Sequence, residues 1–244
     1  MLSFLKSKPL LKDLIPEGYT DIHSHLLFGI DDGAKVLDDT NFLMQSFLDL
    51  GFCNAITTPH TIEHVWDNTR EGILEKYEEV KSLSPELTTK LKLKTASEYM
   101  MNESFFKLFQ SEPLLTLKDK HVLVELSYLS PPMNLYDMLF ELQLAGYTPV
   151  LAHPERYGFF HQNFSEYKKL KKAGCLFQLN LLSSVGYYGP EVTETAEKLL
   201  KKGLIDFTGS DVHHKNHIEA FGKKVKFKDS QALVQAMKQN EFFK

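Results

Sequence analysis

The residues best suited to chemistry are histidines and carboxylates that follow short apolar runs. They are His23 and His25 in DIHSH, His60 in TTPH, Glu98 in ASEY, Glu125 in LVEL, His153 in AHPER, and Asp211 and His213 in GSDVH. If each run is a strand of a parallel α/β fold, these side chains lie at the carboxyl ends of strands, which converge on one face. The sequence therefore predicts one site that gathers imidazoles and carboxylates.

The spacing of these residues favours a metal site. In an extended chain, residues two apart point the same way, so His23 and His25 can hold one ion together. Asp211 and His213 have the same spacing. Imidazoles and carboxylates without thiolates suit Mn²⁺, Fe²⁺, Zn²⁺ or Ni²⁺. The set exceeds what one ion needs, which predicts two or three ions with a carboxylate such as Glu98 between them.

Some members of the set have two interpretations. A single histidine after a strand is more often structural than a ligand, so the metal interpretation depends on the number of strand ends occupied together. Glu125 either binds a metal or orients a residue that does. In the turn GIDDG, one of Asp31 and Asp32 could complete the metal set, and the other shapes the turn.

Arg156 comes three residues after His153 in AHPER. A guanidinium beside a metal cluster suits bidentate binding of a phosphate. The alternative is an ion pair with the neighbouring Glu155. We expect Arg156 to bind a substrate phosphate.

Short runs of strand type alternate with amphipathic helical patterns. The expected strands lie near Tyr19–His23, Phe52–Thr57, Leu91–Ser97, His121–Leu126, Thr148–Ala152, Cys175–Leu179 and Leu204–Thr208. The expected helices are Asp38–Leu50, Thr69–Leu83, Asn134–Ala145, Phe164–Lys172 and Glu191–Lys202. Several end at a glycine, as a helix C-cap does: Gly51, Gly146, Gly174 and Gly203. This alternation predicts parallel βα units in an open doubly wound sheet or a closed barrel.

Composition limits the class of protein. The chain has 244 residues, of which 43% are hydrophobic and 25% charged, and a formal net charge of −4. This is ordinary for a globular protein and gives no electrostatic indication of nucleic-acid binding. We expect one domain over residues 1–244, with residues 1–17 as a loosely ordered N-terminal arm. No apolar stretch approaches the roughly 18 residues of a membrane span, and a secretory signal is not recognisable, so we expect a cytoplasmic protein.

The other notable residues have weaker patterns. Cys53 and Cys175 lie far apart in apolar runs and are expected to be small core residues rather than a disulfide. Histidines away from strand ends are expected on the surface or in loops: His64, His121, His161, His214 and His217. Aromatic residues in expected loops either wall a phenol-sized pocket or serve ordinary packing: Trp66, Tyr99, Tyr128, Tyr157 and Tyr187.

The motifs DIHSHLLFGIDDGAK, TTPH, AHPERY and GSDVH resemble, in order and spacing, those of the polymerase and histidinol phosphatase (PHP) superfamily. Within it the chain most resembles the bacterial manganese-dependent protein-tyrosine phosphatases of capsule and exopolysaccharide biosynthesis. The resemblance implies a distorted, TIM-like (β/α)7 barrel with a metal-binding core at about residues 19–214. It also implies a trinuclear centre in which Mn²⁺ is often preferred. The implied ligands are His23, His25, Asp32, His60, Glu98, His153, Asp211 and His213.

The resemblance also implies a reaction and a partner. A metal-activated hydroxide would attack a tyrosine phosphate, with Arg156 near the substrate, and we expect Arg156, Asp211 and His213 to act in catalysis. The implied partner is the phosphorylated tail of a bacterial tyrosine autokinase, whose state regulates polysaccharide export. The family commonly carries a second arginine after the DxH motif, but HHKNHIEAFGKK has none. Lys215 or Lys223 could substitute as a point charge without the bidentate fork.

Three alternatives remain open from the sequence. The first is a phosphatase of a small molecule such as histidinol phosphate or a sugar phosphate. The second is a catalytically silent metal-binding regulatory protein, although every expected ligand position is filled. The third is an amidohydrolase-type barrel with a carboxylated lysine between its metals, but no lysine ends an expected strand.

Overall fold

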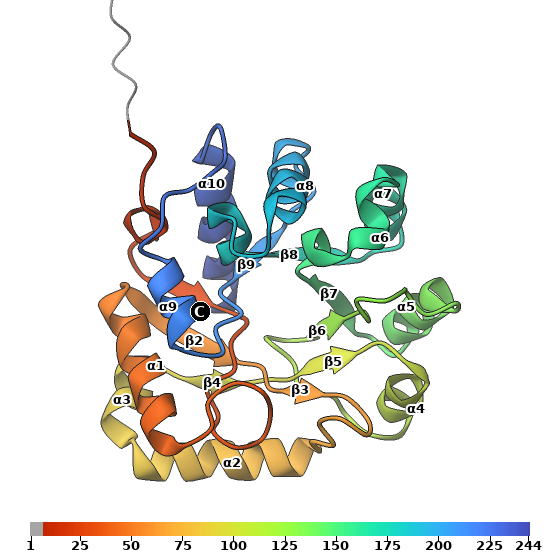
Figure 1. The fold of residues 1–244 in the computed structure, drawn as a ribbon. Helices are drawn as coiled ribbons and strands as arrows, with labels where there is room; N and C mark the ends of the chain where they lie inside the picture. Colours follow the sequence, from red (N-terminus) through yellow and green to blue (C-terminus); the bar gives the residue numbers. More distant parts are fainter. Residues whose placement is uncertain (1–6) are drawn as a thin grey trace, which may run out of the picture.

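The computed structural model describes residues 7–244, and its strands form two parallel sheets (Figure 1). One sheet has the order β1-β2-β4, and the other has the order β3-β5-β6-β7-β8-β9. The strands are β1 (Tyr19–Asp21), β2 (Phe52–Thr57), β3 (His60–Thr61), β4 (Lys94–Thr95), β5 (Glu98–Met100), β6 (His121–Glu125), β7 (Thr148–Ala152), β8 (Leu176–Asn180) and β9 (Phe207–Gly209). Their parallel pairing agrees with the predicted α/β class.

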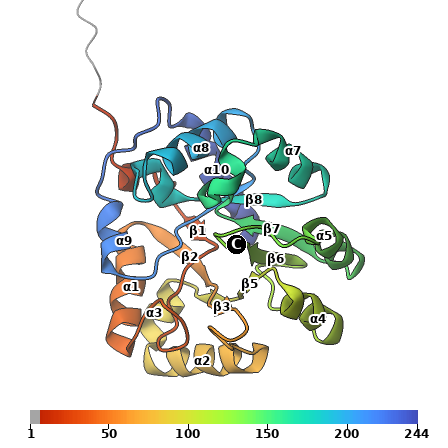
Figure 2. The ribbon, with the colours of Figure 1, turned by 45° about the vertical axis from the view of Figure 1, so that its right-hand side comes forward.

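Helices surround the strands on the outside (Figures 1 and 2). They are α1 (Leu37–Asp49), α2 (Arg70–Leu83), α3 (Pro85–Lys90), α4 (Glu103–Ser111), α5 (Leu135–Leu144), α6 (Gly158–His161), α7 (Phe164–Lys172), α8 (Pro190–Lys201), α9 (Lys215–Ala220) and α10 (Gln231–Gln239). Four 3₁₀ segments join them within residues 7–244: η1 (Leu11–Leu14), η2 (Pro154–Arg156), η3 (Leu181–Val185) and η4 (Asn240–Phe243). The five expected helices are present within one residue of their expected ends, and the four expected C-cap glycines have positive φ.

The strand β2 has the expected bounds, but β1 ends at Asp21 rather than His23 and β9 begins at Phe207 rather than Leu204. β2 ends at Thr57 and the chain resumes pairing as β3 at His60, because the intervening Pro59 has no N–H to donate to a neighbouring strand. The strand expected at Leu91–Ser97 is reduced to β4, and a further short strand that was not predicted, β5, follows it. Glu98 therefore begins a strand rather than following one, and its N–H donates to Pro59 O at 3.1 Å. Residues 7–244 contain nine strands instead of the predicted seven.

The segments after β1 and β9 lie side by side. Ser24 and Val212 form a parallel bridge. Asp211 N donates to His23 O at 2.7 Å, and His25 N donates to Val212 O at 2.9 Å. Two motifs that are almost 190 residues apart in the sequence are thereby held in register.

The apolar core has two parts. The larger lies between strands and helices, where, for example, Phe47 of α1 packs on Phe52 of β2. The smaller contains Ile22, Ile56, Ala96, Leu117, Leu123, Val150, Ala152, Phe207 and Phe243. Because alternate residues of a strand share a face, Glu125 points from the same face of β6 as Leu123. The smaller apolar cluster therefore packs on the same face of the strands as the polar side chains at their ends.

The N-terminal arm is packed against the domain from Pro9 onward. Leu11 is fully buried in η1, and its N–H donates to Lys223 O at 3.0 Å. Val225 N donates in turn to Pro9 O at 3.0 Å. The expectation of a loosely ordered arm is wrong for residues 9–17, because their apolar side chains are used in the core. Residues 1–6 lie outside the described residues.

Two further expectations concern burial and membrane insertion. Cys175 is buried as predicted, but Cys53 is exposed because it points away from the core next to the buried Phe52 on β2. Both cysteines are free. Within residues 7–244, no helix combines the length and the apolar character needed to cross a bilayer.

Candidate metal centre

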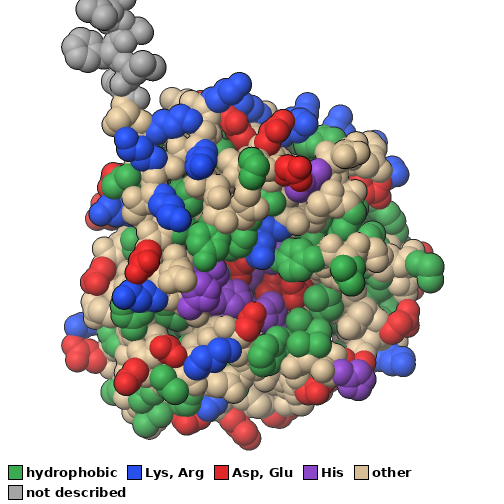
Figure 3. Space-filling model, in the orientation of Figure 1, with side chains coloured by type: hydrophobic (Ala, Val, Ile, Leu, Met, Phe, Trp, Pro, Cys, Tyr) green, Lys and Arg blue, Asp and Glu red, His purple; other side chains and the backbone are tan. Residues whose placement is uncertain are grey.

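The histidines and carboxylates predicted to converge lie in one central hollow, with hydrophobic side chains along part of its rim (Figure 3). Their potential ligand atoms fall into four overlapping groups, each with atoms within 4.8 Å of one another. The groups are His25, Asp32, His60 and His213; His23, Glu98 and His153; His23, His25 and Asp211; and His60, Glu98 and Glu125. All eight residues predicted as ligands occur in these groups, together with Glu125.

Glu98 lies in the middle of the cluster with a fully buried side chain. Its Oε2 is 3.1 Å from His23 Nε2 and 3.1 Å from His60 Nδ1. Its Oε1 is 3.2 Å from His153 Nε2. One carboxylate thus approaches three imidazoles with both oxygens, which is the geometry that a bridging ligand requires.

Asp211 is the second carboxylate that contacts the histidines of the cluster. Its Oδ1 is 3.3 Å from His23 Nε2 and 3.5 Å from His25 Nε2. Its Oδ2 accepts hydrogen bonds from Arg156 Nη1 at 2.7 Å and from Asn180 Nδ2 at 2.9 Å. The carboxylate therefore has one oxygen for the cluster and one fixed by neighbouring donors.

Three histidines have their Nδ1 atoms fixed by hydrogen bonds. His23 Nδ1 lies 2.8 Å from Gln178 Oε1, whose amide is oriented by donation from its Nε2 to Leu179 O. His25 Nδ1 lies 2.7 Å from Asp31 Oδ2, and His213 Nδ1 lies 2.9 Å from a backbone carbonyl. These partners are acceptors, so Nδ1 carries the proton in the neutral imidazole. The Nε2 lone pairs then face the cluster, as metal ligation requires.

The two aspartates of the GIDDG turn have different environments. Asp31 accepts from His25 Nδ1 and from Gly33 N, so it shapes the turn and orients an imidazole. Asp32 Oδ1 lies 3.4 Å from His60 Nε2 at the exposed edge of the cluster. Gly33 is required by close packing, because a Cβ there would lie 2.3 Å from His25 O. Asp32 as a ligand stays a prediction.

The backbone is strained at two of the candidate ligands. His153 has a φ of 36° and Asp211 a φ of 51°, both in the left-handed region that non-glycine residues avoid. Such conformations cost about 1–3 kcal/mol each and cluster at functional sites. This left-handed backbone conformation directs the His153 and Asp211 side chains into the hollow from the ends of β7 and β9.

Several buried polar atoms of the cluster have no hydrogen-bond partner among residues 7–244. They are His60 Nδ1, Glu125 Oε1 and His153 Nδ1. His60 Nδ1 and Glu125 Oε1 are only 3.0 Å apart, but their alignment does not suit a hydrogen bond. His25 Nε2 and His23 Nε2 also face each other at 3.4 Å. Lone pairs that converge without protein donors fit divalent metal ions, so the residues present suit a metal centre.

Without metal, the cluster depends on charged imidazoles. Burial alone would lower the pKa of His23, but the Glu98 and Asp211 carboxylates outweigh it and raise that pKa to about 9. Burial likewise opposes charging of His25, yet the carboxylate of Asp31 helps to raise its pKa well above the ordinary value. The pKa values of Glu98 and Asp211 lie well below their usual range despite burial, because histidines surround both groups.

We expect the metal-free protein to lose stability as the pH rises from 6.5 to 9. The pKa of His23 is about 9 in the folded protein and about 6.5 in the unfolded chain, so its ion pairs contribute fully below pH 6.5 and are lost as the pH rises through 9. The largest loss expected from this residue is about 3 kcal/mol. Urea denaturation in the presence of chelator at pH 6.5 and 9 measures it.

The matched control is the same titration of the metal-loaded protein, where the ion takes the place of the protons and the decline should be smaller. His153 does not mask the effect, because burial lowers its pKa to about 4 and it titrates below this range. A metal-free protein that is equally stable or more stable at pH 9 would contradict the role of these imidazoles.

Arg156 is held beside the cluster by an ion pair and two aromatic rings. Its guanidinium carbon lies 4.1 Å from the centre of the Tyr188 ring and 5.0 Å from that of Tyr128. Its ion-pair partner is Asp211, whereas Glu155 accepts hydrogen bonds elsewhere, from Ser183 Oγ among others. The alternative of an Arg156–Glu155 pair is therefore wrong, and the guanidinium stands at the edge of the cluster.

A cavity of about 180 Å³ opens beside this arginine. It is lined by Asp32, Arg156, Tyr188, Asp211, His213, His214 and His217. Neither lysine considered as a substitute for the missing arginine lines it. Lys215 lies 3.8 Å from Glu219 Oε1, and Lys223 lies over the Tyr187 ring. Histidines occupy this wall, and the substitution of the arginine by a lysine stays a prediction.

The remaining histidines only partly match expectation. His64 and His214 are exposed, and His161 is half-buried in α6. His121 begins β6 rather than a loop and contacts the Phe242 ring. His217 is buried, because its Nδ1 accepts from His213 N and its ring packs on tyrosines of the segment after η3.

The five aromatic residues considered for a pocket have different positions. Tyr128 borders Arg156, whereas Trp66 and Tyr99 line a separate cleft. Tyr157 is fully buried and accepts a hydrogen bond from Leu126 N, so it serves packing. Tyr187 packs on a buried histidine of α9.

Three residues of the site were not singled out by the sequence. Gln178 and Asn180 lie two apart at the end of β8 and bond to His23 and Asp211, respectively. Polar residues at alternate positions of the run LFQLN were the available signal. Tyr188 gave no comparable signal, because its position depends on the segment after η3.

Comparison with known proteins identifies the family. The model of the family described as capsular polysaccharide synthesis, CpsB/CapC, matches residues 19–237. The match covers most of the chain and contains every candidate ligand. The fold and the cluster are those of an α/β protein with a candidate metal centre. The family match shows that the chain belongs to the CpsB/CapC family.

Individual relatives agree with this assignment. The chain is 28% identical to the tyrosine-protein phosphatase YwqE of Bacillus subtilis over 195 residues, which cover 80% of this chain and 77% of YwqE. It is 26% identical to the tyrosine-protein phosphatase CpsB of Streptococcus pneumoniae over 200 residues, covering 80% and 82%.

Solved structures support the fold. One from the crystal structures of YwqE and CpsB, described as unique metal-dependent tyrosine phosphatases, matches with a TM-score of 0.77 and 26% identity, over 92% of this chain and 88% of the other. An amidohydrolase from Mycoplasma synoviae matches over 98% of this chain and 90% of its own, with a TM-score of 0.52 at 14% identity, which indicates a shared fold alone.

Proposed function

We propose that this protein is a metal-dependent protein-tyrosine phosphatase. The observation that carries the proposal is the buried cluster of imidazoles and carboxylates around Glu98, with Arg156 held at its open edge. Relatives across four-fifths of the chain are named tyrosine-protein phosphatases. The cluster can hold cations, and the guanidinium can bind an anion, which together suit a phosphate ester.

The ligands that we propose are the eight residues implied by the PHP resemblance, with Glu125 as an additional ligand or as the residue that orients His60. Their oxygen and nitrogen donors suit two or three Mn²⁺ ions, and Fe, Zn or Ni would also fit. When bound, such ions lower the pKa of water and offset the negative charge of the phosphoryl group.

The protein's own groups position the substrate. Arg156 would bind phosphoryl oxygens through its fork while Tyr128 and Tyr188 hold its plane. Asp211 and His213 line the same cavity and would act next to the reacting phosphorus. A phenol has a pKa of about 10, so a tyrosine leaves with less need of a proton donor than a serine does.

We further propose a biological setting and an architecture. The substrate would be the phosphorylated tail of a bacterial tyrosine autokinase, in capsule or exopolysaccharide synthesis, and the free thiols of Cys53 and Cys175 suit the reducing cytoplasm. The whole chain would be one domain with a distorted (β/α)7 barrel. The bridge between Ser24 and Val212 supports closure between the first and last strands.

The test is phosphate release from three substrates by the Mn²⁺-loaded protein: a phosphotyrosine peptide, the matching phosphoserine peptide and histidinol phosphate. We expect turnover mainly of the phosphotyrosine peptide. Preference for histidinol phosphate would favour the small-molecule alternative, and metal binding without turnover of any of the three would favour a silent regulatory protein.

A further inference from the structure

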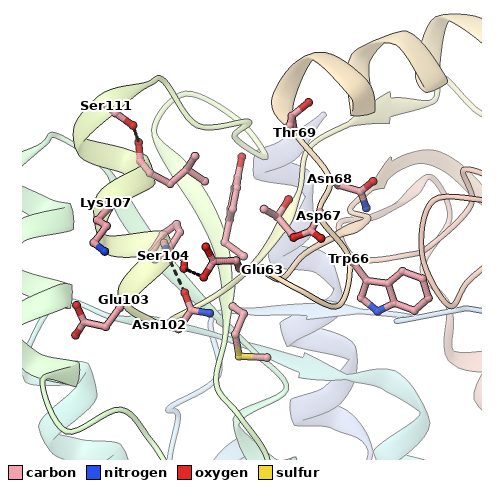
Figure 4. A pocket seen from close by; sticks show the side chains of 15 residues that line it. Glu63, Trp66, Asp67, Asn68, Thr69, Asn102, Glu103, Ser104, Lys107 and Ser111 are labelled. Atoms are coloured by element: carbon pink, nitrogen blue, oxygen red, sulfur yellow. Dashed lines mark hydrogen bonds between the residues drawn. The ribbon is translucent and has the colours of Figure 1, made fainter.

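A second cleft lies next to the metal centre, between the loop that joins β3 to α2 and the helix α4 (Figure 4). Its volume is about 550 Å³, about three times that of the cavity beside Arg156. Figure 4 shows side chains from both elements around it, with Glu63 hydrogen bonded to Ser104 between them. The cleft is large enough for an extended side chain of a bound peptide.

The cleft is fixed to the strands that carry two candidate ligands. Thr61 and Tyr99, which line it, directly follow His60 and Glu98 and are paired with each other in register. Asn68, also in its wall, donates from Nδ2 to His60 O at 2.8 Å. Successive residues of a strand point to opposite faces, so the cleft lies across the β3–β5 pair from His60 and Glu98, and a peptide that crosses this edge of the sheet could reach both the metal centre and the cleft.

The lining combines an apolar floor with a negative rim. The floor contains Tyr99, Met100, Phe105 and Leu108, with Trp66 at the side toward Lys35. The carboxylates of the rim are Glu63, Asp67 and Glu103. Among the described residues, no lysine or arginine nitrogen lies within 4 Å of these three groups. Within the part of the chain that the structure describes, Lys107 is the one lysine or arginine that lines the cleft.

The rim carboxylates do have hydrogen bonds. Glu63 accepts from Ser104 Oγ, and Glu103 accepts from Asn134 Nδ2 at 3.2 Å. Asp67 accepts from His64 N at 2.7 Å. These donors are neutral, and the one imidazole nearby, the exposed His64 with its Nε2 3.8 Å from Glu63 Oε2, gives no permanent positive charge to the rim. A cation brought by a ligand would supply the missing charge partner.

We propose that this cleft binds a lysine or arginine side chain adjacent to the phosphotyrosine of the substrate protein. The inference rests on the proposed function. The alkyl stem would lie on the apolar floor and the charged head would meet the carboxylates of the rim. An extended peptide advances about 3.4 Å per residue, so three positions on either side of the phosphotyrosine reach about 10 Å from it.

The test compares two phosphotyrosine peptides of equal length, one with lysines and one with glutamates at the three positions on either side. We expect kcat/KM for the lysine peptide to exceed that for the glutamate peptide by about tenfold, as expected for several partly exposed charge pairs. In the double variant Glu63→Gln/Glu103→Gln, the ratio should fall to about twofold or threefold. The amide oxygens can still accept from Ser104 and Asn134, so the cleft keeps its shape.

The matched control is Glu191→Gln/Glu194→Gln, which removes two exposed carboxylates from α8, away from the cleft. It should keep the tenfold ratio. The single variant Asp67→Asn provides a second test, because it leaves the contacts of Glu63 with Ser104 and of Glu103 with Asn134 unchanged. It should lower the ratio of kcat/KM between the two peptides by about half.

The outcomes separate two failures. Equal turnover of both peptides by the unmodified protein, or a ratio unchanged in the cleft variants, would overturn the cleft proposal and leave the phosphatase intact. No turnover of either peptide by metal-loaded protein would overturn the proposed function and this inference with it.

Discussion

The Glu98→Gln variant should lose its metal and at least about a thousandfold of its phosphatase activity, because a bound metal supplies several kcal/mol of transition-state stabilisation. The carboxylate approaches His23, His60 and His153 with its two oxygens. An amide has the same shape but offers one neutral acceptor and a donor that repels cations. Metal per chain by elemental analysis and kcat/KM on a phosphotyrosine peptide measure the two effects.

Glu125→Gln is the comparison for this variant. Glu125 is also buried at a strand end, but among residues 7–244 it lies within ion-pair distance of one candidate histidine, His60, at 3.0 Å, whereas Glu98 approaches three. Its loss should cost about 10- to 100-fold if it orients a ligand. Full metal content and near-normal turnover in Glu98→Gln would contradict a bridging role for Glu98.

The Arg156→Met variant should keep its metal but lose about a hundredfold in kcat/KM, since hydrogen bonds to charged groups contribute about 1.5–3 kcal/mol. Methionine can fill the space between Tyr128 and Tyr188 without a charge. Arg156→Lys should recover part of the loss, because it restores the charge but not the fork.

Metal content separates the two possible roles of Arg156. If the arginine serves mainly to hold Asp211, to which it donates at 2.7 Å, both variants should lose metal together with activity. Unchanged metal with reduced turnover supports phosphate binding. Unchanged turnover in Arg156→Met would exclude it from the reaction.

The sequence predicted the site better than the details of the fold around it. Strand ends follow from local apolar runs, so His23, His153 and Asp211 could be placed at one face without tertiary information. His60 was also found, because it follows β2 closely, although it begins a short strand of its own, β3, that was not predicted. The residues that orient the ligands were harder to find, since Gln178 reaches His23 across 155 positions.

Two other incorrect predictions also concern contacts between residues that are far apart in the sequence. The N-terminal arm packs because Leu11 finds a place against the segment that follows α9, a contact between opposite ends of the chain. His217 looks like a surface histidine in its local sequence, yet the tyrosines after η3 cover it. Local patterns carry no information about such long-range partners.

The most direct test of the account is a titration of chelator-treated protein with Mn²⁺ while phosphate release from a phosphotyrosine peptide is followed. We expect no turnover without metal and a rise that saturates at two or three ions per chain. Full turnover by metal-free protein, or none at any concentration of Mn²⁺, Fe²⁺, Zn²⁺ or Ni²⁺, would contradict it.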